Sequence, residues 1–381
     1  MNVIPIIRPF LGAEEAAAAS EAIASGWVAQ GPRVAEFERN FAARVGATQA
    51  IAVSSCTTGL HLAMHLLGLG AGDEVVVPSL SFIATQNAVR YVGATPVFCD
   101  VEETTQNISA ATIEPCLTPA TKAVMVVHQG GIPADVKAIH ALCDPLGIAV
   151  VEDAACAIGS TIDGELVGRH SDLVVFSFHP RKVLTTGEGG MITTSREDWA
   201  ERLRRLREHG MSVSAAARHG AKSPVIEQYL EMGFNFRMTD IQAAVGLVQL
   251  SKLDVIIARR RELAARYQEL LGEIPGLTMA QDPPFGTTNF QSFWVVLPDD
   301  FPVGRDGLLQ TMMDNQISPR RGIMASHLEP AYAGHPHRPL PVTERLTRQS
   351  VILPLFHTMT EDDQDRVVGV LRDAASVPAS A

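Results

Sequence analysis

The sequence predicts an α/β protein in which helices cover both faces of a mostly parallel central sheet, with a smaller α+β domain after it. Short, continuous apolar segments recur through the first half of the chain, and segments with helical spacing separate them. After Gly276 the sequence pattern changes to Pro-rich loops and short apolar segments such as residues 292–297. We therefore expect a large domain over residues 1–250 and a small C-terminal domain over residues 251–381.

Each element follows from a local pattern. Helices are predicted where alanine dominates or apolar residues recur at helical spacing, over residues 13–24, 34–45, 57–67, 81–92 and 135–146. Strands are predicted at the short apolar segments 51–53, 74–78, 96–99, 123–127, 148–151, 173–178 and 191–194. From Asp240 a helical pattern continues to Leu271 and predicts one long helix that leaves the first domain.

Composition limits the classes of protein to consider. The chain has 381 residues, of which 46% are hydrophobic and 19% charged, so it is long enough for two domains and too apolar for a disordered chain. Its formal net charge of -11 argues against a nucleic-acid partner, since proteins that read a phosphate backbone carry a basic face.

Cysteine usage and the chain start indicate a cytoplasmic protein. The five cysteines are odd in number and lack the spacing of a disulfide framework or a zinc site, so we expect small buried thiols. His61 and His65 have a metal-like spacing, but no third ligand is evident, and we expect no metal. We expect neither a signal peptide nor a membrane partner, because no apolar segment approaches the ~20 residues of a membrane span.

A lysine and an aspartate carry the strongest chemical signal. Lys182 follows an apolar strand and precedes the Gly-rich segment 187–190, and Asp153 ends another apolar strand. A lysine that forms a Schiff base and a carboxylate that keeps a pyridine nitrogen protonated are what an enzyme needs to hold pyridoxal 5'-phosphate (PLP). Alone, Lys182 could be a surface charge and Asp153 a helix cap; together they favour the cofactor.

Other strand ends supply what a phosphate and a flat ring need. Cys56 and Thr57 open a helix directly after a strand, where free N–H groups bind anions, although simple N-capping explains the same pattern. Ser177 is placed to add a hydroxyl to the same phosphate. Phe82 begins a helix after Pro78 and is either a core aromatic or a side chain that stacks on the cofactor.

One glycine-rich segment suggests a different class but has the wrong context. Residues 68–72 follow a helix and precede a strand, whereas a dinucleotide-binding loop follows a strand and opens a helix. The sequence also lacks a Walker motif and a Gly-x-Ser-x-Gly elbow. A nicotinamide oxidoreductase therefore remains only a weak alternative.

With these residues in hand, the chain resembles the DegT/StrS-type nucleotide-sugar aminotransferases, PLP-dependent enzymes with the aspartate aminotransferase fold (fold type I). The resemblance covers nearly the whole chain, and its motifs keep their order and spacing. They lie at residues 25–27, 30–32, 36–38, 54–57, 78–85, 152–155, 176–190 and 233–244.

The resemblance implies a role for each matching residue. Lys182 is the implied Schiff-base lysine, and Asp153 the implied partner of the pyridine nitrogen. Thr57 and Ser177 are implied to bind the phosphate, and Phe82 to stack on the ring. Some relatives carry His at the lysine position and act as dehydratases, so Lys182 favours transamination.

Three further positions follow from the same resemblance. Cys56 belongs to the phosphate-binding turn through its backbone. Cys156 stands where relatives often carry Gln or His near the ring oxygen of the cofactor, and a thiol is a weak donor. Asn235 is implied to reach the phosphate of a partner subunit's cofactor, so the expected active unit is a homodimer with shared active sites.

The implied reaction moves an amino group, from L-glutamate by resemblance, to the keto group of a nucleotide-linked sugar in amino-sugar biosynthesis. We expect Trp27, Arg320 and His327 to contact substrate, although a solvated basic turn explains Arg320 almost as well. Two alternatives stay open: an aminotransferase acting on a keto-cyclitol or another antibiotic-pathway ketone, and a non-catalytic PLP-binding regulatory protein.

Overall fold

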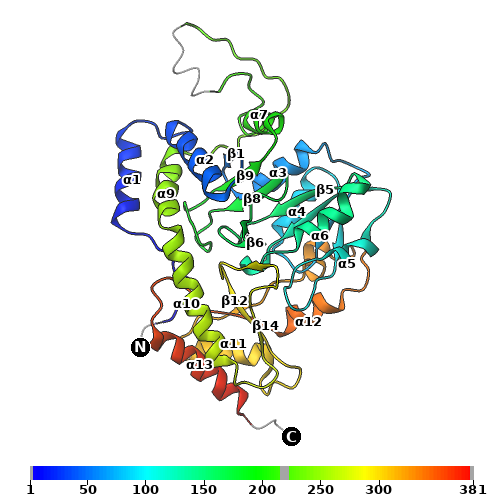
Figure 1. Cartoon of the computed structure of the whole chain (residues 1–381), viewed down its shortest axis with the longest axis vertical. Coiled ribbons are helices and arrows are strands. Elements are labelled where there is room, and N and C mark those ends of the chain that lie inside the picture. The colour runs from blue at the N-terminus through cyan, green and yellow to red at the C-terminus, as the bar shows by residue number, and fades with distance from the viewer. Residues whose placement is uncertain (1–2, 215–222, 378–381) are drawn as a thin grey trace.

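A seven-stranded sheet forms the centre of the computed structural model, which describes residues 3–214 and 223–377 (Figure 1). Its strands lie in the order β1 (Gln49–Val53), β9 (Gly190–Thr194), β8 (Leu173–Ser177), β5 (Ala149–Asp153), β4 (Thr121–Val127), β2 (Glu74–Pro78) and β3 (Thr95–Cys99). Strand β9 runs antiparallel to both neighbours, and the others run parallel to one another. The mostly parallel sheet is thus as predicted.

Helices cover both faces of this sheet, as continuous apolar strands require. On β2, Val75 and Val77 pack into one core with α3 (Cys56–Leu66), α4 (Ala84–Tyr91) and α7 (Glu197–Leu206). Between them, Val76 faces the opposite core, to which α2 (Pro32–Val45), α6 (Val136–Cys143) and α9 (Asp240–Ser251) contribute. The remaining helices of this half are α1 (Ala13–Ala24) and α5 (Ala110–Ile113).

A second, antiparallel sheet lies in the C-terminal part of the chain. It contains four strands in the order β10 (Thr278–Met279), β12 (Phe293–Val296), β14 (Ser350–Leu353) and β13 (Arg320–Arg321). The helices here are α10 (Leu253–Leu271), α11 (Gly304–Asp314), α12 (Pro341–Gln349) and α13 (Glu361–Ala375). The predicted mixture of helices and antiparallel strands is confirmed, while the domain boundary at residue 250 stays a prediction.

Several backbone connections join the N-terminal and C-terminal parts of the chain, and two of them involve short β-pairings. A three-stranded sheet pairs β11 (Gly286–Thr287) with β6 (Thr161–Ile162), which in turn pairs with β7 (Glu165–Leu166). At the chain start, the Ile4 N–H donates to the Gln316 carbonyl at 2.9 Å, and the Ser318 N–H donates to the Ile4 carbonyl at 2.8 Å. The first described residues therefore lie against the C-terminal part.

The single long helix expected from Asp240 to Leu271 is wrong in one respect. The helix breaks at Lys252, and α9 and α10 meet at an angle of 57°. The Lys252 ammonium binds the buried Glu15 carboxylate at 2.7 Å, which fixes the bend against α1. Apolar periodicity continues across the break, so the pattern alone does not reveal it.

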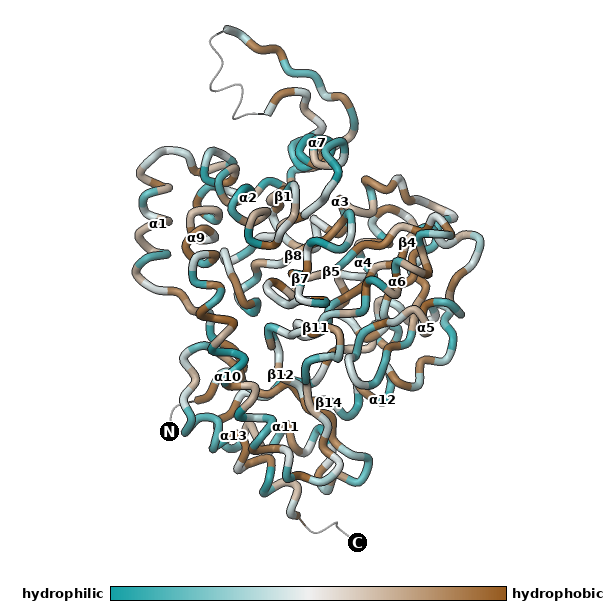
Figure 2. Tube along the Cα trace, viewed as in Figure 1, coloured by the Kyte–Doolittle hydropathy of each residue, from teal (hydrophilic) through white to brown (hydrophobic). Residues whose placement is uncertain are grey.

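The hydropathy of the trace agrees with a buried sheet, whose strands are largely brown in Figure 2. In the two described ranges, no single helix has both the length and the apolar character needed to cross a bilayer, although the bent pair α9 and α10 together would meet that requirement.

Candidate active site

The carboxyl ends of the parallel strands meet at one edge of the sheet, where a cavity of about 300 Å³ opens. We call this the catalytic cavity. Strand β5 delivers Asp153, β8 delivers Ser177, and α3 begins just after β1. The predicted residues that line it are Cys56, Thr57, Phe82, Asp153, Cys156, Ser177, Lys182 and Arg320.

Lys182 lies in the loop after β8, and its side chain points at the cavity wall formed by Cys156. The Lys182 Nζ donates to Cys156 Sγ at 3.1 Å. Burial alone lowers the pKa of this amine, but Cys156 and the nearby Asp153 carboxylate outweigh that effect and raise it above its ordinary value. The cavity therefore contains the amine that a Schiff base requires, and this amine is hydrogen-bonded to the Cys156 sulfur.

Asp153 is buried, with 6% of its surface exposed, and three groups donate to its carboxylate. The Thr85 hydroxyl donates to Oδ2 at 3.0 Å, the Ala155 N–H donates to Oδ1 at 3.1 Å, and the Cys56 thiol donates to Oδ1 at 3.9 Å. Burial raises the pKa of the carboxyl, while the Ala155 N–H, Lys182 and Thr85 oppose that rise. A carboxylate in such a place gains from a cation, such as a protonated ring nitrogen.

The start of α3 presents backbone N–H groups that suit an anion. Ser55 caps the helix by accepting from the Thr58 N–H at 3.1 Å, and the N–H groups of Cys56 and Thr57 in the first turn have no partner within the helix. Gly190 at the start of β9 packs directly beneath the turn, because a Cβ there would lie 2.6 Å from the Ser55 carbonyl carbon. The turn is thus held rigidly beside Ser177.

Phe82 also lines the cavity, and 59% of its surface is exposed, so its ring is accessible to a ligand. An exposed ring beside a buried amine and a buried carboxylate suits a flat heteroaromatic molecule. With the anion site at α3, the residues present fit PLP: an amine for its aldehyde, a carboxylate for its ring nitrogen and N–H groups for its phosphate. The roles of individual residues toward the cofactor remain predictions.

Three residues expected near substrate or cofactor do not line this cavity. Trp27 is half-buried beside Gly31, and Asn235 is exposed and forms a backbone bridge with Glu208, while the rings of its sequence neighbours Phe234 and Phe236 stack on each other. His327 is buried, and its Nδ1 lies 2.6 Å from the Ser79 hydroxyl. The predicted roles of all three residues, toward substrate for Trp27 and His327 and toward a partner for Asn235, stay predictions.

Sequence reasoning missed two residues of the cavity region. Thr85 lies within the motif at residues 78–85, but its bond to Asp153 joins α4 to the end of β5, two elements far apart in the sequence, and has no local pattern. Arg181 precedes Lys182 and lines the cavity. Its position beside the lysine was a usable signal, because cavities that bind anionic substrates need a cation.

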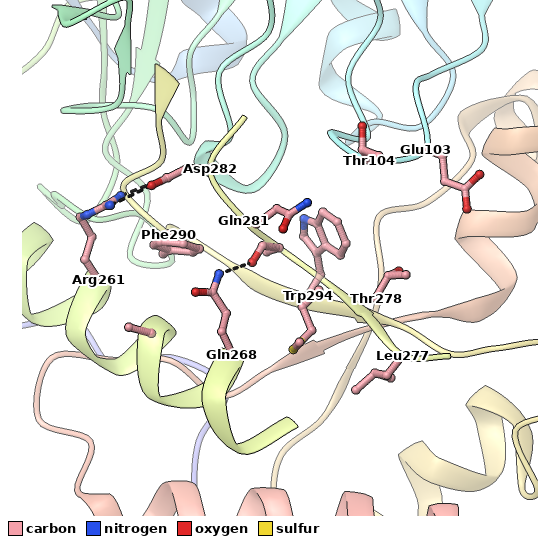
Figure 3. A pocket seen from close by; sticks show the side chains of 13 residues that line it. Glu103, Thr104, Arg261, Gln268, Leu277, Thr278, Gln281, Asp282, Phe290 and Trp294 are labelled. Carbon is pink, nitrogen blue, oxygen red and sulfur yellow. Dashed lines mark hydrogen bonds and ion pairs between the residues drawn. The ribbon is translucent and has the colours of Figure 1, made fainter. Parts of the chain in front are cut away.

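Another cavity, of about 670 Å³, lies between α10, the strands β10 and β12, and the loop at Glu103 (Figure 3). We call this the interdomain cavity. It shares Trp294 as a wall with the catalytic cavity. Its charged groups are already paired, since Arg261 binds Asp282 at 2.8 Å.

Among residues 3–214 and 223–377, no group of three or more His, Cys, Asp or Glu side chains is arranged to hold a metal ion. His61 and His65 instead pack their rings against Phe234, with centroids 4.9 and 5.3 Å away.

This fold and the lysine–aspartate cavity define the class of PLP-dependent aminotransferases. The chain belongs to the DegT/DnrJ/EryC1/StrS aminotransferase family, whose model matches residues 9–372. The resemblance predicted from the motifs is confirmed, and so are the fold class, the enzyme class and the cofactor. A non-catalytic regulator and a nicotinamide oxidoreductase are no longer alternatives.

Related proteins span the whole chain. The spore coat polysaccharide biosynthesis protein SpsC of Bacillus subtilis (strain 168) is 38% identical over 98% of this chain and 97% of its own. The aminotransferase TlmJ from Streptoalloteichus hindustanus is 38% identical, with a TM-score of 0.90 over 97% of this chain and 98% of its own. DesI, solved in the presence of its TDP-sugar product, is 32% identical, with a TM-score of 0.89 over 99% and 94%.

Proposed function

We propose that this aminotransferase moves an amino group from L-glutamate to the keto group of a sugar linked to a nucleoside diphosphate. Two of the related proteins support a sugar substrate: one is named for polysaccharide biosynthesis, and another was solved with a TDP-sugar. The observation that carries the proposal is the convergence of Lys182, Asp153 and two arginines on one cavity.

The two arginines, Arg181 and Arg320, provide for an anionic substrate. Burial, and then the neighbouring Arg181 charge, lower the pKa of the Arg320 guanidinium. Within the part of the chain that the structure describes, neither side chain forms an ion pair, although the carboxylate of Glu188 lines the same cavity. Two like charges that form no ion pair attract an anion, which here is the donor carboxylate or the diphosphate.

The side chains of this cavity divide the chemistry among themselves. When bound, PLP supplies an aldehyde that reacts with amines and a ring that withdraws electrons from the carbon being deprotonated. Asp153 would lie against the ring nitrogen and favour its protonated form, and the Thr85 hydroxyl orients the Asp153 carboxylate. Lys182 would anchor the cofactor through its amine and would serve as the base and acid that moves the proton of the donor's α-carbon.

We also propose a homodimer, supported by an exposed apolar arm. The described residues on either side of 215–222 extend beyond α7, away from the rest of the molecule (Figure 1), and carry brown segments in Figure 2. Ile226 is 90% exposed and Met232 76% exposed, values typical of side chains that a partner covers. Asn235 follows on the same arm, which suits a residue that serves a second subunit.

A reducing cytoplasm is the location we propose for this dimer. All five cysteines are free thiols. Secreted proteins of oxidising compartments tend to pair their cysteines, whereas intracellular proteins keep them reduced.

The substrate proposal is tested by offering the purified, PLP-loaded protein L-glutamate together with a panel of acceptors. We expect glutamate-dependent amination of a nucleotide-linked keto-sugar, measured by mass spectrometry of the product and by release of 2-oxoglutarate. Equal or better amination of a free keto-cyclitol would contradict the proposal. In the Arg320→Ala variant we expect a raised KM for the anionic substrate. Arg345→Ala, which removes an arginine outside the catalytic cavity, is the control and should leave this KM unchanged.

A further inference from the structure

Two cysteines that the proposed reaction does not use lie next to each other at the edge of the central sheet. Cys99 is the last residue of the edge strand β3, and Cys116 ends the short 3-10 turn Glu114–Cys116. Both thiols donate to the carbonyl oxygen of Thr112, Cys99 Sγ at 3.0 Å and Cys116 Sγ at 3.5 Å. Because both sulfurs contact one oxygen, they lie close to each other.

The pKa values of the two thiols are shifted in opposite directions. Cys99 is fully buried, and its hydrogen bond to Cys116, together with burial, raises the pKa of its thiol well above the ordinary value. The same hydrogen bond lowers the pKa of Cys116 to about 7, aided by Arg338 and opposed by burial. Cys116 is 5% exposed and lies near the exposed Arg338, so it is the member of the pair that a small oxidant reaches as a thiolate.

We propose that Cys99 and Cys116 form a redox-sensitive dithiol, which a peroxide converts into an intramolecular disulfide. The Cys116 thiolate attacks one oxygen of hydrogen peroxide, forms a sulfenic acid and releases hydroxide, which takes up a proton. The Cys99 sulfur then attacks the sulfenic sulfur, and the S–S bond forms as water leaves. Two thiols and one peroxide thus give one disulfide and two waters, and a dithiol reductant reverses the step.

This pair sits at a junction that reaches the catalytic cavity. The Cys99 carbonyl accepts from the Ser79 N–H at 3.0 Å, and Ser79 begins the loop that carries Phe82. The next residue, Asp100, accepts from the Thr343 N–H at 2.7 Å at the start of α12. A covalent bond formed here acts on the loop that holds Phe82, which makes the dithiol a place for reversible control.

The test treats the full-length, PLP-loaded protein with hydrogen peroxide, followed by alkylation of the unfolded protein and peptide mapping. We expect two of the five thiols to become unreactive and the peptides of Cys99 and Cys116 to be cross-linked until dithiothreitol is added. The rate is expected to rise with pH through about 7, as the Cys116 thiol loses its proton.

Two variants sharpen the result. Cys116→Ala removes the nucleophile, and no cross-link to Cys99 forms. Cys143→Ala is the matched control: burial raises the pKa of this thiol to about 11, and its loss leaves the cross-link unchanged. A cross-link between Cys56 and Cys156, or an unchanged count of five thiols after peroxide, would overturn the proposal; the wild-type peptide map decides this even where a variant fails to fold.

Discussion

Two cavities separated by Trp294 differ in how their charges are satisfied. The interdomain cavity is the larger, about 670 Å³ against about 300 Å³, yet its Arg261 is bound to Asp282. The smaller catalytic cavity holds a buried amine, a buried carboxylate and two arginines without ion pairs among the described residues. A buried charge without an oppositely charged partner gains from a ligand that supplies one, so the absence of ion pairs, rather than volume, distinguishes the catalytic cavity.

Replacing Lys182 by Ala gives the largest expected effect. The variant loses the amine that anchors the cofactor and moves the proton, and we expect transamination to fall by at least about 10³-fold. Borohydride reduction should attach the cofactor covalently to the parent protein and not to the variant, as measured by intact mass. Lys137→Ala, which removes an exposed lysine bound to Asp163, is the control and keeps full activity. Near-normal turnover by the Lys182 variant would contradict the assignment of the reaction to the catalytic cavity.

Asp153→Asn comes next. The change keeps the shape but removes the negative charge, so we expect kcat to fall by about 10²- to 10³-fold, the range for losing one preorganised electrostatic partner. Steady-state transamination with saturating acceptor measures this. If the variant keeps more than a tenth of the parent kcat, the Asp153 carboxylate has only a structural role, as the acceptor of the Ala155 N–H.

Thr85→Val tests whether orientation of that carboxylate matters. Valine has the same shape and lacks the hydroxyl that donates to Asp153 Oδ2 at 3.0 Å. A hydrogen bond to a charged group contributes about 1.5–3 kcal/mol, so we expect kcat to fall about 10- to 100-fold. Thr85→Ser, which keeps the hydroxyl, should recover most of the rate; equal activity of both variants would argue against the role.

The smallest effect is expected in the interdomain cavity. Arg261→Ala removes a partly exposed ion pair and should lower the free energy of unfolding by about 0.5–1 kcal/mol. Urea denaturation measures this loss. A double-mutant cycle with Asp282→Ala and the double variant gives the interaction energy of the Arg261–Asp282 pair. The ratio kcat/KM should stay within about twofold of the parent value. A loss of catalysis here would show that the larger cavity takes part in the reaction.

The sequence predicted most of what local patterns control. The strand ending near Asp153 and the turn at Cys56 follow from apolar segments and their flanking residues, and structure and prediction agree on them within a residue or two. The bend at Lys252 and the bond from Thr85 to Asp153 depend on contacts between distant segments. Periodicity carries no information on such contacts, and for the same reason it did not reveal that His327 is buried behind Ser79.

The pairing of Ile4 with Ile317 bears on how the protein is made. Ile4 is synthesised well before Ile317, so the bridge between them cannot form until the later segment has been made. Ile6 and Ile7 line a small cleft with Arg181 and Arg320. The surroundings of both arginines are therefore assembled only after synthesis has passed Ile317, and a nascent chain cut short before that residue lacks the partner that holds these isoleucines in place.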